Sequence, residues 1–290
     1  LLVVVGALAL AVFRPWSEFS VYRMNRIFHP QERIENHRHM ERIFPSRHIP
    51  AAKTPLRFES AAAPVPDSYE FKGERRTLAD FVARTATTSL VVLRDGKVQS
   101  EQYFTGADAG SHFTSWSVAK SFVVTMIGMA LLDGRIASLD DPVSRYVPEL
   151  AGKPYGEATL RSVMQMASGI RFDETYTDKL SDINKLFYKV FIFGQPVDRA
   201  VSDYPREAPP STRFRYVSSD SQVLSWVVRS VFGKPLAEVA RERLWEPLGM
   251  ESDAFWNLDT EGGRELGYCC LNATARDFAR LGQLYLQDGV

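Results

Sequence analysis

A serine and a lysine stand three positions apart in FTSWSVAKSF, residues 113–122, where a polar segment gives way to an apolar one. On a helix, residues i and i+3 face the same way with Cβ atoms about 5–6 Å apart, so the amine of Lys120 can reach the hydroxyl of Ser117. A neutral amine there would accept the serine proton, and burial lowers a lysine pKa by up to about 3–5 units. A capping serine followed by a surface lysine is the alternative interpretation.

Histidine-based mechanisms do not fit the order of residues in this chain. Every histidine precedes Ser117, and the GxSxG motif is absent, which excludes the hydrolases whose histidine follows the nucleophile. The histidines are His29, His37, His39, His48 and His112. A serine that is activated here therefore needs a base of another residue type.

Composition and motifs argue against several other functions. Lys+Arg and Asp+Glu number 35 each, so no net field favours nucleic acid. The chain has no Walker loop and no GxGxxG motif. His37 and His39 lack a further ligand at metal-binding spacing, and Cys269 and Cys270 are adjacent, which suits neither a zinc site nor a secreted disulfide scaffold. We expect no metal, no cofactor and no nucleic-acid partner.

The surrounding sequence predicts the elements that would position Ser117 and Lys120. Two strand-like runs flank Asp95-Gly96, which is a strong hairpin signal. The stretch from Val118 to Gly134 is apolar nearly all round, which predicts a helix buried on every side. Residues 141–265 are predicted to form helices and loops. Further helix signals are the apolar spacing after Thr77, a stop at Gly233 and a capping box at Thr274 and Asp277.

A second motif, Tyr216-Val217-Ser218, lies further along the chain, directly before a predicted helix. Together with the SxxK motif and the stretch NATARDFARLGQLYL, it resembles the serine β-lactamase and DD-peptidase superfamily. The branch that it resembles holds class C β-lactamases, carboxylesterases and 6-aminohexanoate-dimer hydrolases. The resemblance covers about residues 78–290. It implies that Ser117 is the acylated nucleophile, that Lys120 accepts its proton, and that Tyr216 relays a proton to the leaving group.

The same resemblance implies an α/β fold of the α+β type, in which helices flank an antiparallel sheet and a large all-helical domain is inserted. We expect residues 69–116 and 265–290 to form the α/β domain and residues 117–264 the helical domain. The Lys/His-Thr-Gly motif of the family is absent. We therefore expect the C-terminal part of the sheet, this third motif and the second oxyanion donor to lie beyond residue 290, the first donor being the backbone N–H of Ser117.

Three further residues are expected to face the substrate. Ser218 stands where the family usually has asparagine, which weakens an assignment as a classical β-lactamase. Tyr176 and Asp182 lie in the loop FDETYTDKLSDI. The predicted function is a serine hydrolase that cleaves a small amide or ester, of the 6-aminohexanoate-oligomer, ester, β-lactam or D-peptide type, through an acyl-serine. The alternative is a catalytically silent, penicillin-binding-like protein that binds cell-wall peptide or a protein partner.

The N-terminal sequence predicts a link to a membrane. Residues 1–13, LLVVVGALALAVF, are apolar but too few to span a hydrocarbon core of about 30 Å, which predicts the remnant of an anchor or signal sequence. A buried core helix is the alternative. Residues 14–68 are basic and then rich in Ala and Pro, as in a tether. The charge pattern leaves the orientation open, and family habit predicts a bacterial inner-membrane protein with a single anchor and a periplasmic body.

Overall fold

The computed structural model describes residues 2–13 and 21–289. Its α-helices are α1 (Leu2–Phe13), α2 (Val21–Asn25), α3 (Arg33–Arg38), α4 (Leu78–Thr85), α5 (Ala119–Leu132), α6 (Pro154–Glu157), α7 (Leu160–Met164), α8 (Asp182–Phe187), α9 (Val197–Val201), α10 (Ser218–Phe232), α11 (Leu236–Ala240) and α12 (Ala275–Leu286). Short 3₁₀ or π-helical turns are η1 (Met40–Arg42), η2 (Trp116–Val118), η3 (Val143–Arg145), η4 (Pro148–Leu150), η5 (Tyr188–Ile192) and η6 (Arg241–Trp245). The strands are β1 (Ser46–Ile49), β2 (Ser68–Phe71), β3 (Glu74–Thr77), β4 (Ser89–Arg94), β5 (Lys97–Tyr103), β6 (Phe113–Thr114), β7 (Ala254–Asn257) and β8 (Leu271–Ala273).

Four short strands form an antiparallel sheet in the order β1-β7-β8-β6. β1 pairs with β7 from Ser46 opposite Asn257 to Ile49 opposite Ala254. The sequence predicted only helices and loops for residues 141–265, so β7 is a strand that it missed. The strand has 4 residues, all buried, and therefore lacks the alternation that marks a half-exposed strand.

The predicted hairpin is confirmed as β4 and β5. Asp95 and Gly96 connect the strands with φ of 52° and 75°, the left-handed backbone that a two-residue hairpin turn requires. α12 packs against β4. This helix begins at the predicted capping box, where the Thr274 side chain accepts a hydrogen bond from the backbone N–H of Asp277.

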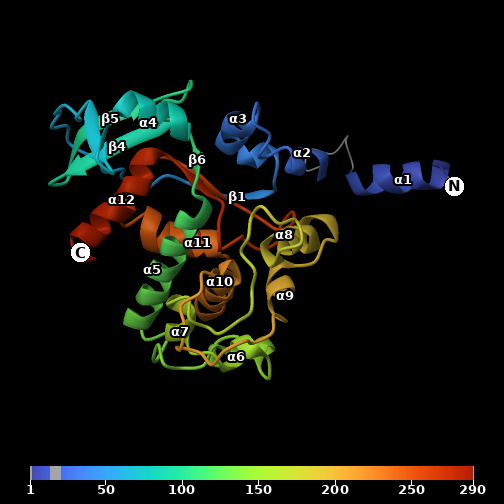
Figure 1. Cartoon of the computed structure of the whole chain (residues 1–290). Coiled ribbons are helices and arrows are strands. Elements are labelled where there is room, and N and C mark those ends of the chain that lie inside the picture. The colour runs from blue at the N-terminus through green and yellow to red at the C-terminus, as the bar shows by residue number, and fades with distance from the viewer. Residues whose placement is uncertain (1, 14–20, 290) are drawn as a thin grey trace.

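Helices α5 and α10 pack against each other and lie between the β4–β5 hairpin at one end of the molecule and α6 and α7 at the other (Figure 1). α5 is the buried helix that the sequence predicted: Phe122, Met126 and Ile127 are each 0% exposed. Each such side chain contributes about 1.5–3 kcal/mol through burial. α10 ends at Gly233, whose φ of +66° lies in the left-handed region, as predicted for the stop signal. The proposed catalytic motifs lie at the N-terminal ends of these two helices.

A second, smaller hydrophobic core holds residues 21–44, which we call the N-terminal segment. Its buried members are Met24, Ile27, Met40, Ile43 and Phe44, joined by Phe255 of β7. Trp116, Phe187 and Phe191 pack against them. This part of the predicted tether therefore packs on the body, while residues 14–20 lie outside the described residues. The division of the chain into domains at residues 69, 117 and 265 stays a prediction.

The expected fold class is confirmed, because antiparallel sheets combine with many helices. The expected bacterial inner-membrane location, with its N-terminal anchor and periplasmic body, is contradicted. Helix α1 has 12 residues and extends about 18 Å at about 1.5 Å per residue, short of a hydrocarbon core of about 30 Å. Across residues 2–13 and 21–289, no helix combines the length and the apolar content that a membrane crossing needs.

Candidate active site

Ser117 lies in the short turn η2, between strand β6 and helix α5. The turn is tied to strand β8, because the backbone N–H of Ser115 donates to the carbonyl of Leu271 at 2.7 Å and the Ser115 hydroxyl accepts from the N–H of Leu271 at 3.1 Å. Trp116 has a φ of +40°, in the left-handed region that non-glycine residues rarely adopt. Such strain costs about 1–3 kcal/mol and often occurs at functional sites. The backbone is therefore held in an uncommon conformation directly before the predicted nucleophile.

Lys120 lies one turn further on and is buried, with 7% of its surface exposed. Its Nζ donates a hydrogen bond to the Oγ of Ser117 at 3.1 Å and another to the carbonyl of Tyr268 at 2.7 Å. Burial lowers the pKa of Lys120 to about 8, against a smaller opposing effect of the Glu174 charge. The surface-lysine alternative is therefore wrong. The geometry places a readily deprotonated amine on the serine hydroxyl.

Tyr216 approaches the same pair from the segment that leads into α10. The Lys120 Nζ lies 5.1 Å from the centre of the Tyr216 ring. Burial raises the pKa of the Tyr216 hydroxyl above its usual value, and a hydrogen bond with Ser117 acts in the opposite direction. The three residues of the two sequence motifs thus meet at one point, although 96 positions separate Lys120 from Tyr216.

Ser218 and Tyr176 lie beside Ser117, whereas Asp182 lies next to a neighbouring cavity. Ser218 and Tyr176 line the same cavity as Ser117 and Lys120. The Asp182 carboxylate accepts a hydrogen bond from the backbone N–H of Asp173 at 2.9 Å, and it lines a neighbouring cavity instead. It therefore holds the loop before α8 and lies outside the cavity next to Ser117.

Glu174 is a residue of this site that the sequence analysis missed. Its carboxylate accepts hydrogen bonds from the backbone N–H of Ser218 at 2.9 Å, from the Ser218 hydroxyl at 2.5 Å and from the Tyr176 hydroxyl at 2.8 Å. It thus ties the loop that carries Tyr176 to the first turn of α10. The only available signal was its position two residues before Tyr176 in a loop already expected to face the substrate.

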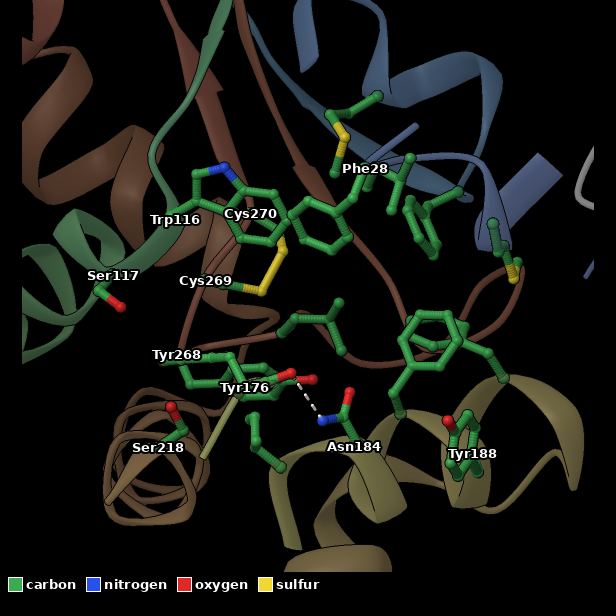
Figure 2. A pocket seen from close by; sticks show the side chains of 18 of the residues that line it. Phe28, Trp116, Ser117, Tyr176, Asn184, Tyr188, Ser218, Tyr268, Cys269 and Cys270 are labelled. Atoms are coloured by element: carbon green, nitrogen blue, oxygen red, sulfur yellow. Dashed lines mark hydrogen bonds between the residues drawn. A yellow bond between two sulfur atoms is a disulfide. The ribbon is translucent and has the colours of Figure 1, made fainter. Parts of the chain in front are cut away.

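A cavity of about 220 Å³ opens beside Ser117 and Lys120. Figure 2 shows Ser117 at one side of the drawn residues and Tyr188 at the opposite side, with Phe28 between them. Cys269 and Cys270, which also line the cavity, are joined by a disulfide (Figure 2). Within the described residues, no group of three or more histidine, cysteine, aspartate or glutamate side chains is arranged to hold a metal ion.

Comparisons with known proteins identify the family. The beta-lactamase family model matches residues 75–290. The chain is 30% identical over 254 residues to a 6-aminohexanoate-dimer hydrolase from Paenarthrobacter ureafaciens, with 84% of this chain aligned. The aligned region spans 61% of that relative's length.

Solved structures extend the comparison to the fold. A proposed 6-aminohexanoate-dimer hydrolase from Bacillus anthracis superposes with a TM-score of 0.83 at 28% identity, over 92% of this chain and 71% of that one. A D-alanine carboxypeptidase, AmpC, from Burkholderia cenocepacia shares the fold with a TM-score of 0.52 at 21% identity, over 71% of this chain and 61% of the other. The family match, the relatives and the fold lead to one conclusion: the chain belongs to the beta-lactamase family of serine hydrolases.

Proposed function

We propose that the protein cleaves a small amide or ester through an acyl-enzyme on Ser117. The observation that carries this proposal is the 3.1 Å hydrogen bond between the Lys120 Nζ and the Ser117 Oγ, made by an amine whose pKa burial lowers to about 8. A neutral Lys120 takes the proton as the Ser117 Oγ attacks the substrate carbonyl carbon. The resulting oxyanion needs hydrogen-bond donors, and the backbone N–H of Ser117 is the first of them.

Tyr216 completes the proton path in this proposal. Its ring lies 5.1 Å from the Lys120 Nζ, and the Ser117 side chain acts to lower the pKa of its hydroxyl, which places Tyr216 beside both residues. It passes a proton to the departing amine or alcohol, which breaks the bond from the carbonyl carbon to the leaving group. Water then attacks the acyl-serine, gives a proton back through the same residues, and releases the acid with Ser117 regenerated.

Labelling of the full-length protein tests the nucleophile. A fluorophosphonate probe should attach to Ser117, and mass spectrometry of the digested protein should find the adduct on the peptide that holds it. Ser117→Ala should abolish the label with the fold unchanged by circular dichroism. Ser121→Ala, which changes an exposed serine one turn along α5, is the matched control and should label normally. An unlabelled wild-type protein, or a label that persists in Ser117→Ala, would remove the assignment and favour a silent binding protein.

A further inference from the structure

Two cavities of opposite character meet at the proposed catalytic residues. The cavity beside Ser117 and Lys120 is lined mainly by apolar and aromatic side chains, whereas Tyr216 lines the neighbouring cavity. The charged residues of that second cavity are Arg171, Asp173, Glu174, Asp182, Lys185, Glu207 and Arg215. Because Tyr216 is proposed to protonate the leaving group, the leaving group should lie on the charged side. The acyl chain then falls into the apolar cavity.

The apolar cavity offers no negatively charged partner for an acyl chain that ends in an ammonium group. Among the described residues that line it, Lys120 is the only Lys, Arg, Asp, Glu or His. The two amide side chains that line it, Asn25 and Asn184, carry no charge, and the Asn184 nitrogen donates to the carbonyls of Tyr176 at 3.2 Å and Asp178 at 2.8 Å. An ammonium group that entered the cavity would lose its water without a matching negative charge, which is strongly unfavourable.

The N-terminal segment provides one wall of this cavity. Met24, Ile27, Phe28, Met40 and Phe44 line it from that side. Two aromatic contacts join this wall to the rest of the cavity lining. Phe28 stacks on Trp116, next to the nucleophile, with ring centres 5.2 Å apart, and Phe44 packs against Phe191 of η5 at 4.8 Å.

We propose that the N-terminal segment forms a wall of the acyl-binding site, and that this site selects an uncharged aliphatic or aromatic acyl chain. The inference rests on the proposed function and names its substrate class. It sets this chain apart from an enzyme for 6-aminohexanoate amides, whose acyl part ends in an ammonium group. The volume of about 220 Å³ exceeds the roughly 150 Å³ of an engineered cavity that holds benzene. A chain of about six carbons is therefore a suitable probe.

Three p-nitrophenyl esters test the selectivity: acetate, hexanoate and 6-aminohexanoate. A fully buried methylene improves kcat/KM by about fourfold, and hexanoate has four more methylenes than acetate, so full burial would give roughly 250-fold; with partial burial we expect hexanoate to exceed acetate by roughly tenfold or more. The 6-aminohexanoate ester, which has the same chain with a terminal ammonium, should fall at least roughly tenfold below hexanoate. Equal kcat/KM for hexanoate and acetate, or for hexanoate and 6-aminohexanoate, would overturn the inference.

Variants of the wall test the part played by the N-terminal segment. Phe28 is 62% exposed, so its replacement should leave the fold intact. Phe28→Ala should lower the hexanoate-to-acetate ratio, and Phe28→Glu should raise the ratio of 6-aminohexanoate to hexanoate by roughly tenfold. Phe71→Ala, at an exposed phenylalanine of β2 outside the cavity, is the matched control and should keep both ratios.

The outcomes separate the two proposals. If all three esters turn over but the kcat/KM ratios of Phe28→Ala and Phe28→Glu match those of the wild type, the N-terminal segment does not form a wall of the acyl-binding site. The proposed serine hydrolase activity is then retained. If fluorophosphonate labels Ser117 and the ester preferences are reversed, the selectivity alone is wrong. If no ester turns over and Ser117 does not label, both proposals are overturned.

Discussion

The pH dependence of acylation offers the sharpest test of Lys120. Burial lowers the pKa of this amine to about 8, and only the neutral amine accepts a proton from Ser117. The neutral fraction rises from about 1% at pH 6 to about 50% at pH 8 and about 90% at pH 9. The kcat/KM should therefore increase about 90-fold over this range and level off above pH 9. An unperturbed lysine, with a pKa of about 10.4, would still be climbing there.

The assay follows the release of p-nitrophenol from the hexanoate ester at substrate concentrations well below KM, with spontaneous hydrolysis subtracted at each pH. Circular dichroism at pH 6 and pH 9 checks that the fold is constant. Under these conditions the curve reports the free enzyme, so its midpoint can be compared directly with the pKa of Lys120.

Glu174→Gln provides an internal check on the origin of the midpoint. The Glu174 charge raises the pKa of Lys120, so its removal should move the midpoint to lower pH. Glu149→Gln, which neutralises an exposed carboxylate of η4, is the matched control and should leave the midpoint in place. A flat profile between pH 6 and pH 9, or a midpoint that moves up in Glu174→Gln, would refute the reasoning.

Two further predictions concern the proton path and a buried carboxylate. Lys120→Ala and Tyr216→Phe should each lower kcat by about 10²–10⁴-fold. Because both residues serve one proton path, the double variant should lose less than the two single losses multiplied together. Near-normal turnover in Tyr216→Phe would return that residue to a structural role. Burial raises the pKa of Asp220 to about 7. The folded protein therefore keeps the Asp220 carboxyl protonated at pH values above about 4, where the unfolded chain releases that proton. The stability that the raised pKa contributes is fully present below about pH 4 and is lost as the pH rises to about 7. In urea unfolding, the free energy of unfolding of the wild type should fall by up to about 4 kcal/mol relative to that of Asp220→Asn across this window. Free energies that change in parallel with pH in the two proteins would contradict the prediction.

Local sequence signals were sufficient for much of the fold. Asp95-Gly96, Gly233 and the Thr274 capping box each act through backbone geometry within a few residues, so the hairpin and helix ends that they predicted are confirmed. The contact between Ser117 and Lys120 was predictable for the same reason, because a single helical turn sets their separation. Tyr216 required a family resemblance, since nothing local links it to a site 96 positions before it.

Features that depend on distant contacts were not predictable from the residues alone. Strand β7 pairs with β1, whose Ser46 opposes Asn257 from the other end of the chain. Glu174 acts by accepting hydrogen bonds from Ser218, 44 positions away. The sequence of the N-terminal segment predicted a tether because charged residues predominate in it, and the few apolar residues that pack on Trp116 are scattered among them. In each case tertiary packing decides the structure, and no short sequence window contains that information.

The Cys269–Cys270 disulfide joins neighbours in the sequence, and this has a consequence for what the bond can do. A cross-link stabilises a fold mainly by shortening the free loops of the unfolded chain, and a ring of two adjacent residues shortens almost nothing. Its influence is therefore confined to the turn that it closes. That turn follows Tyr268, whose carbonyl accepts a hydrogen bond from the Lys120 Nζ at 2.7 Å. Reduction of this bond should therefore affect the hydrogen bond that holds the Lys120 side chain and leave the melting temperature of the protein almost unchanged.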